Sequence, residues 1–163
     1  SKKDILELIQ RIRKELPDAA IRTSLIVGFP LETDKEFKEL LNFVQEVKFE
    51  RLGVFVYSRE EGTTAYDFKA QVPEKVKISR LKAVMSAQQV ISKAINEKFL
   101  GKEINVLIDE KGKDFYLARS QYDAPEVDGL VYLKSKGTLK PGDFVKVKII
   151  DTLEYDLVAQ VEP

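Results

Sequence analysis

The spacing of hydrophobic residues predicts two helices in the first third of the chain. Apolar positions recur at helical spacing from Ile5 to Leu16, directly after a Ser1–Asp4 pattern that is typical of a capped helix start. A second helix is expected after Thr33, because Glu36 follows three residues later and apolar residues then repeat at the same spacing.

Two apolar stretches alternate with these helices and predict strands. Residues 20–27 and 51–58 are almost continuously apolar, which is typical of strands buried on both faces of a parallel sheet. Helix, strand, helix, strand with short connections indicates a βαβ arrangement. Two parallel strands do not make a stable sheet. We therefore expect either further strands upstream of Ser1 or pairing of the open edge of 20–27 with another copy.

The pattern changes twice in the rest of the chain. Residues 73–99 predict one long helix, whose apolar stripe is expected to be core packing: Ile78, Leu81, Met85, Ile91 and Ile95. After Gly101 a period of two predicts five short strands, at 104–108, 115–119, 127–133, 144–150 and 155–161. Pro141 and Gly142 stand where a type II turn requires them. Five short strands in so few residues predict a small antiparallel β-barrel.

Composition limits the chemistry that the chain supports. The 163 residues contain no cysteine and no histidine, which excludes disulfides and thiolate metal sites and leaves only carboxylates for zinc or iron. No apolar stretch approaches the length of a membrane span, and no signal peptide is visible.

Charge differs between the two parts of the chain, although the whole is neutral with 27 basic and 27 acidic residues. Residues 1–96 carry 17 basic and 14 acidic groups, whereas residues 97–163 carry 10 and 13. Nucleic-acid modules draw most of their affinity from neutralising phosphates. The acidic barrel is therefore better suited to a basic protein.

The stretch RTSLIVGFPLET at 22–33 has two interpretations. It is either a buried strand with a Gly-Phe-Pro turn and a capping box, or a ligand site at a strand end, where parallel α/β folds place their ligands. Gly28 favours the second, because glycine lets a ligand approach the backbone closely. The exit of the second strand, from Arg59 to Thr64, would lie at the same rim, where Glu32, Glu60 and Glu61 are either contacts for substrate lysines or plain surface charge.

Several stretches together resemble a known family. IRTSLIVGFPLETDKEF, RLGVFVYSREEGTTAY and QVPEKVK, in this order and spacing, resemble the carboxyl half of the radical S-adenosylmethionine barrel of methylthiotransferases. The last part resembles their terminal TRAM barrel. ARSQYDAPEVDGLVYL and PGDFVKVKIIDTLEYDLVA resemble the RimO type, which adds a methylthio group to the β-carbon of an aspartate in small-subunit ribosomal protein twelve.

The resemblance implies a fold class of α/β plus all-β. Residues 1–72 would be the carboxyl-terminal part of an open, TIM-like radical S-adenosylmethionine barrel, 73–99 a connecting helix, and 100–163 a five-stranded antiparallel TRAM barrel of OB-like form. The cofactors implied are S-adenosylmethionine and two 4Fe-4S clusters, the clusters being held upstream of this chain. The partners implied are the missing amino-terminal half and the basic ribosomal protein, in the cytoplasm. This part alone is expected to be inactive.

The resemblance also implies site residues. Seven residues would line the S-adenosylmethionine site: Thr23, Ser24, Ile26, Gly28, Phe55, Val56 and Tyr57. Four residues of the barrel would dock the substrate protein, with the alternative that they form a solvated acidic loop: Tyr122, Asp123, Glu126 and Asp128. The family usually reads GFPGET, and here Leu31 replaces the second glycine, so a different loop backbone is expected there.

Two other functions remain open from the sequence. The first is the tRNA-modifying branch of the same family, against which the acidic barrel and the ARSQYDAPEVDG stretch speak. The second is a non-enzymatic adaptor, which the absence of histidine and cysteine favours if the chain is complete.

Overall fold

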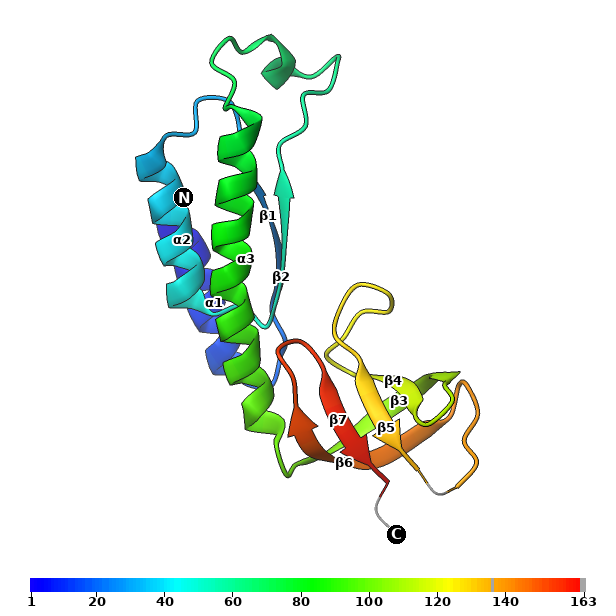
Figure 1. Cartoon of the computed structure of the whole chain (residues 1–163). Helices are drawn as coiled ribbons and strands as arrows, with labels where there is room; N and C mark the ends of the chain where they lie inside the picture. Colours follow the sequence, from blue (N-terminus) through cyan, green and yellow to red (C-terminus); the bar gives the residue numbers. More distant parts are fainter. Residues whose placement is uncertain (136, 162–163) are drawn as a thin grey trace. The chain divides into compact units, whose positions relative to one another are not determined.

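The computed structural model describes residues 1–135 and 137–161, and the chain divides into two compact units, Ser1–Ile91 and Ser92–Pro163 (Figure 1). The predicted domain limits of 1–72, 73–99 and 100–163 stay a prediction, and their last two residues, 162–163, lie outside the described residues.

The first unit is a two-stranded parallel sheet with helices against one face (Figure 1). Its elements are α1 (Lys2–Glu15), β1 (Arg22–Val27), α2 (Asp34–Val47), β2 (Arg51–Val56), the short 3-10 helix η1 (Thr64–Asp67) and most of α3 (Glu74–Asn96). Both predicted capping boxes are confirmed, at Ser1 with Asp4 and at Thr33 with Glu36.

The strands pair in register, so their side chains sort cleanly between the two faces. Arg22 lies opposite Arg51 and Ile26 opposite Phe55, and in β1 the residues between them alternate between exposed and covered. Leu52 packs on the helices with Ile9, Val47 and Phe49. The prediction that both faces are buried is wrong for the described residues, because the helices cover only one face. Among these residues β1 pairs with β2 alone, which confirms the expected open edge.

Polar residues share the buried face of α3 in the first unit with members of the predicted apolar stripe. Lys77, Arg80 and Gln88 are buried together with Val84. Of the predicted stripe Ile91 is buried, whereas Ile78 is exposed. Each of the three polar side chains donates to a backbone carbonyl, respectively Tyr57, Glu32 and Phe49. The spacing of apolar residues did not predict these buried polar side chains, because long polar side chains are normally expected to face solvent.

The second unit is a closed five-stranded barrel with the strand order β3-β4-β5-β7-β6. Its strands are β3 (Glu103–Lys111), β4 (Tyr116–Ser120), β5 (Val131–Lys134), β6 (Phe144–Thr152) and β7 (Leu157–Gln160). The short 3-10 helix η2 (Glu97–Phe99) precedes them. Inward-facing side chains fill the barrel with an apolar core that includes Ile108, Leu133 and Ile149. Gly142, with φ +93°, confirms the predicted turn before β6.

One strand pair corrects the prediction of a wholly antiparallel barrel. β5 and β7 are parallel, and the other four neighbouring pairs are antiparallel. Directions cannot alternate all the way round a closed ring with an odd number of strands, so at least one pair must be parallel.

Among the described residues no helix, α3 included, combines the length and the apolar character that crossing a membrane requires.

Candidate functional site

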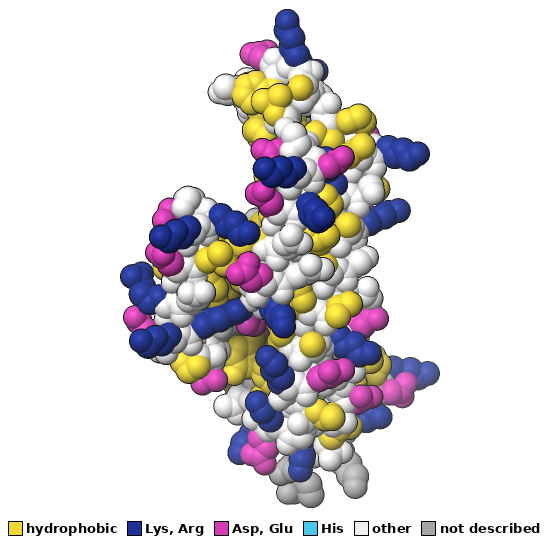
Figure 2. Space-filling view, turned by 90° about the vertical axis from the view of Figure 1, so that its left-hand side faces the viewer, with side chains coloured by type: hydrophobic (Ala, Val, Ile, Leu, Met, Phe, Trp, Pro, Cys, Tyr) yellow, Lys and Arg dark blue, Asp and Glu magenta, His cyan; other side chains and the backbone are white. Residues whose placement is uncertain are grey.

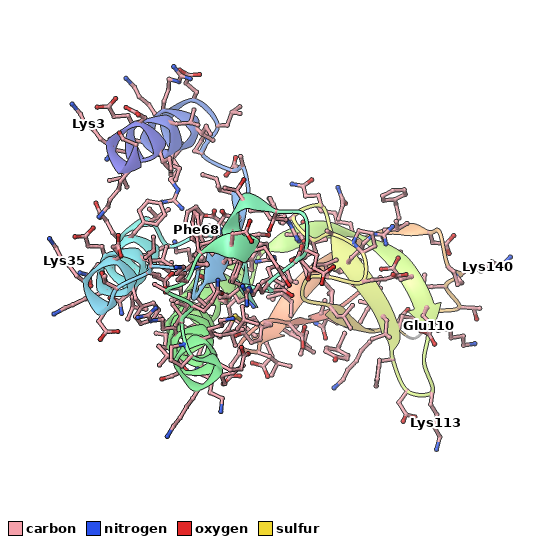
Figure 3. All side chains as sticks on the ribbon, turned by 90° about the horizontal axis from the view of Figure 1, so that it is seen from above. Lys3, Lys35, Phe68, Glu110, Lys113 and Lys140 are labelled. Atoms are coloured by element: carbon pink, nitrogen blue, oxygen red, sulfur yellow. The ribbon has the colours of Figure 1, made fainter. Side chains whose placement is uncertain are left out.

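The carboxyl ends of β1 and β2, which we call the carboxyl rim, carry a cluster of aromatic rings. The Tyr57 amide donates to the Val27 carbonyl at 2.9 Å and so extends the strand pairing by one residue. The Phe29 ring centroid lies 5.2 Å from that of Tyr57 and 6.3 Å from that of Phe68. Phe68 comes from the loop that contains η1, labelled in the view from above in Figure 3. Hydrophobic side chains also gather over this loop at the top of Figure 2.

The face of the sheet that the helices leave uncovered becomes apolar towards the carboxyl rim. Ser24, Ile26 and Phe55 lie on this face, and Ile26 and Phe55 are 58% and 59% exposed. A Cβ at Gly53 would stand 3.4 Å from the Phe55 ring, so the ring leans over the glycine towards Ser24. This arrangement gives a flat aromatic platform beside an aliphatic side chain and a hydroxyl group.

Two of the residues predicted for the cofactor site lie on the other face of the sheet, and a third, Tyr57, is buried at the carboxyl rim. The alternation in register puts Thr23 and Val56 on the helix-covered face, opposite the platform. Tyr57 is buried, and within the described part of the chain its hydroxyl has no hydrogen-bond partner. The Lys77 ammonium donates to the Tyr57 carbonyl and lies 5.4 Å from the centre of its ring.

The loop that leaves β1 is held by a carboxylate of its own and by the backbone of the segment that follows η1. The Gly28 amide donates to Glu32 Oε1 at 3.0 Å, and the Leu31 amide to the Ala70 carbonyl at 3.0 Å. Gly28 and Leu31 have φ values of +75° and +73°. Two of the four residues from Gly28 to Leu31 therefore have a left-handed backbone conformation, and one of these two is not a glycine.

The predicted docking loop of the barrel is built partly from its own acidic residues. Asp123 Oδ2 accepts from the Ser120 hydroxyl at 2.5 Å, and Asp128 Oδ2 accepts from the Ala124 amide at 2.7 Å. The Tyr122 ring packs against Phe99 at 5.5 Å. Glu126 is exposed at the tip of the loop. Two of the predicted acids thus shape the loop, and Glu126 presents its charge to solvent.

The turn between β6 and β7 lies against this loop and extends its acidic surface. A Cβ at Gly129 would meet the Tyr155 carbonyl oxygen at 1.9 Å, and Asp156 Oδ1 accepts from the Leu130 amide at 2.8 Å. Partial burial, and then the charge of Glu154, raise the pKa of the Tyr155 hydroxyl. Sequence reasoning missed this turn, because no pattern along the chain shows that the two loops meet.

Comparisons with known proteins agree with this architecture. A TRAM domain family model matches residues 100–161. Over 162 residues the chain is 50% identical to the ribosomal protein uS12 methylthiotransferase RimO of Clostridioides difficile, covering 99% of this chain and 36% of that protein. The RimO protein of Desulforamulus reducens is 50% identical over 94% of the chain, and that of Parabacteroides distasonis 43% over 99%.

The chain is similar to RimO proteins over nearly its whole length. It spans a little over a third of the length of the curated relatives it matches, between 35% and 38% of these three. A solved structure of Mycoplasma genitalium RNase R is also similar, with 13% identity, a TM-score of 0.28 and coverage of 53% of this chain and 18% of that one. This likeness is too low to carry an argument.

The similarity to RimO proteins implies iron–sulfur clusters and S-adenosylmethionine in a full-length enzyme, and the residues of this chain fit these two groups unequally. The chain has no cysteine or histidine, and no group of three or more acidic residues within its described part is arranged to hold a metal ion. These residues do not fit a cluster. The platform at Phe55 with Ile26 and Ser24 does fit an adenosyl group, which presents a flat ring and ribose hydroxyls.

The backbone at Leu31 is left-handed, with a φ of +73°, a conformation that glycine adopts without strain. Leu31 adopts it nevertheless, with its side chain 62% exposed. The expectation that Leu31 changes the loop backbone relative to GFPGET stays a prediction.

Proposed function

We propose that the chain is the carboxyl-terminal part of a cytoplasmic methylthiotransferase that modifies the β-carbon of an aspartate in ribosomal protein uS12. The observation that carries this is the identity of 43–50% with RimO proteins over 94–99% of the chain. In this proposal β1 and β2 belong to an open, TIM-like barrel whose other strands, together with the residues that hold the clusters, lie elsewhere in the enzyme.

The uncovered face supplies one wall of the S-adenosylmethionine site. Phe55 and Ile26 would hold the adenine, and the Ser24 hydroxyl would bind the ribose. Cleaved with one electron from an iron–sulfur cluster held elsewhere in the enzyme, the cofactor would supply the radical chemistry of hydrogen abstraction. The chain orients the adenosyl group and keeps water from it, which the apolar carboxyl rim favours.

Binding of S-adenosylmethionine to the full-length, cluster-loaded protein tests this wall. F55A and I26A should each raise the dissociation constant about tenfold, which corresponds to about 1.4 kcal/mol. T23V is the matched control, because Thr23 neighbours Ser24 in sequence but lies on the helix-covered face. If T23V and I26A weakened binding of S-adenosylmethionine equally, the assignment of the cofactor site to the uncovered face would be wrong.

The reaction itself is tested with uS12, S-adenosylmethionine and a one-electron reductant, because cleavage of the cofactor consumes an electron. The full-length, cluster-loaded protein should replace one hydrogen of a single uS12 aspartate by a methylthio group, with the corresponding gain in mass, and the 163-residue chain alone should not. Transfer to tRNA in place of uS12 would overturn the choice of substrate.

The acidic surface of the barrel is proposed to dock the basic uS12 protein. Opposite charges across an interface steer association and raise its rate. E126K should slow binding of uS12 several-fold at low salt and less at high salt. E110K is the matched control. Glu110 is an acidic residue of the β3–β4 hairpin (Figure 3), which lies at the opposite end of β4 from the docking loop, so E110K makes the same change in charge outside the proposed docking surface. Salt-sensitive binding of tRNA by the barrel would favour an RNA partner instead.

A further inference from the structure

A buried arginine of α3 holds the loop that leaves β1. Arg80 donates through one terminal nitrogen to Glu32 Oε1 at 2.6 Å and to the Glu32 carbonyl at 3.1 Å. Its other terminal nitrogen donates to Asp34 Oδ1 at 2.7 Å. Because Glu32 Oε1 also accepts from the Gly28 amide, the guanidinium, the carboxylate and the end of the strand form one chain of hydrogen bonds.

This chain of contacts is not an ordinary surface ion pair. The side chains of Arg80 and Glu32 are 6% and 12% exposed, while that of Asp34 is 97% exposed. The guanidinium carbon also lies 5.4 Å from the centre of the Phe37 ring. Exposed ion pairs are weakened by water and salt, whereas salt screens a buried pair much less, and removing one partner leaves a buried charge uncompensated. The buried ion pair between Arg80 and Glu32, rather than the exposed one with Asp34, therefore determines where the loop lies.

The opposite end of the same two strands carries a similar arrangement. Arg13 of α1 donates to the Val47 carbonyl at 2.6 Å, to the Lys48 carbonyl at 3.0 Å and to Glu50 Oε1 at 3.3 Å. Glu50 Oε2 in turn accepts from the Ile21 amide at 2.9 Å, just before β1. The two ends are thus secured by the same chemistry, but only the carboxyl rim adjoins the proposed cofactor site.

We propose that Arg80 is a positioning residue for S-adenosylmethionine, which it serves by fixing, through the Glu32 carboxylate, the turn at Gly28, two residues after Ile26 of the proposed cofactor wall. This role rests on the proposed function. It assigns Arg80 no contact with the cofactor. The effect of Arg80 on binding is transmitted through the backbone of the loop from Gly28 to Glu32.

The test compares R80Q with R13Q in the full-length, cluster-loaded protein. Both changes remove a guanidinium that joins a carboxylate to backbone carbonyls. R80Q should raise the dissociation constant of S-adenosylmethionine at least tenfold, and R13Q should leave it within twofold. R80K keeps the charge but not the planar fork that reaches Glu32 and Asp34 together, so its binding should fall between R80Q and the unaltered protein.

Hydrogen exchange supplies a readout that needs no cofactor. R80Q and E32Q should accelerate exchange of the Gly28 amide more than tenfold and leave Ile21 unchanged, and R13Q should do the reverse. If R80Q does not fold, R80K and E32Q decide the question with the same two measurements.

The outcomes separate the role of Arg80 from the function on which it rests. If the unaltered protein fails to bind S-adenosylmethionine, the proposed function falls, and the role with it. If the unaltered protein binds and R80Q weakens binding no more than R13Q does, the role of Arg80 alone is overturned. Unchanged exchange at Gly28 in R80Q and E32Q would overturn it as well.

Discussion

The substitution G28A probes how tightly α3 packs on the end of β1. Gly28 has a φ of +75°, and a Cβ there would stand 2.3 Å from Lys77 Cγ. Lys77 has little freedom to withdraw, because its stem is buried and its ammonium donates to the Tyr57 carbonyl at 2.9 Å. The added methyl group therefore forces either the loop or the lysine to move.

Two contributions set the size of the effect. A left-handed backbone at alanine costs about 1 kcal/mol. Displacing Lys77 loses a hydrogen bond from a charged donor, which is worth about 2 kcal/mol. Together they predict that G28A lowers the free energy of unfolding of the first unit by about 3 kcal/mol.

Native-state hydrogen exchange at amides of β1 and α2 measures this loss. G62A is the control, because Gly62 has a φ of +79° but no atom within 4 Å of its Cβ position, so only the backbone contribution of about 1 kcal/mol is expected. The double variant G28A/K77A should lose less free energy of unfolding than the sum of the two single losses, because truncation of Lys77 removes the clash with the added methyl group. A loss for G28A that matches the loss for G62A would refute the reasoning.

Three further predictions concern other parts of the chain. L31G should raise the free energy of unfolding by about 0.5 kcal/mol, because relief of the left-handed backbone outweighs the added freedom of unfolded glycine; a lower thermal midpoint would contradict this. G129A should destabilise the barrel by more than about 3 kcal/mol in hydrogen exchange, since its Cβ would overlap the Tyr155 carbonyl oxygen, and a stable variant would show that the two loops are not in contact. Hydrogen bonds from the Thr33 amide and then its hydroxyl hold the pKa of Glu36 below its ordinary value of 4.5. This capping box therefore stabilises α2 above about pH 4.5 and loses its contribution as pH falls through the lowered pKa. E36Q, which does not titrate, should remove this loss from a plot of the free energy of unfolding against pH.

The helix caps and most secondary-structure elements could be predicted from local patterns in the sequence. Both helix caps, the long helix and all five barrel strands follow from side-chain chemistry or spacing within a few residues, and the structure contains each of them. The parallel pairing of β5 with β7 was missed because strand direction depends on how the ring closes. No short stretch of sequence contains that information.

The candidate site was harder to predict because it depends on the phase of a strand. A run such as Thr23–Val27 has no polar alternation from which to choose a face, and only the position of the helices decides it. The structure puts Ser24 and Ile26 on the uncovered face and Thr23 on the other. Arg80 was missed for a related reason: a charged residue in a helix is expected at the surface unless something buried requires its charge.

The uncovered face also shows a gradient that bears on where a ligand lies. Arg22 and Arg51 form its amino end, Ser24 and Gly53 its middle, and Ile26 and Phe55 its carboxyl end, each pair in register across the two strands. A planar, largely uncharged group such as adenine gains from the aromatic and aliphatic surface, which loses little on leaving water. At the amino end the corresponding pair, Arg22 and Arg51, offers charge in place of this apolar surface. The order of these three pairs along the strands therefore favours binding at the carboxyl rim, independently of the general rule for parallel folds.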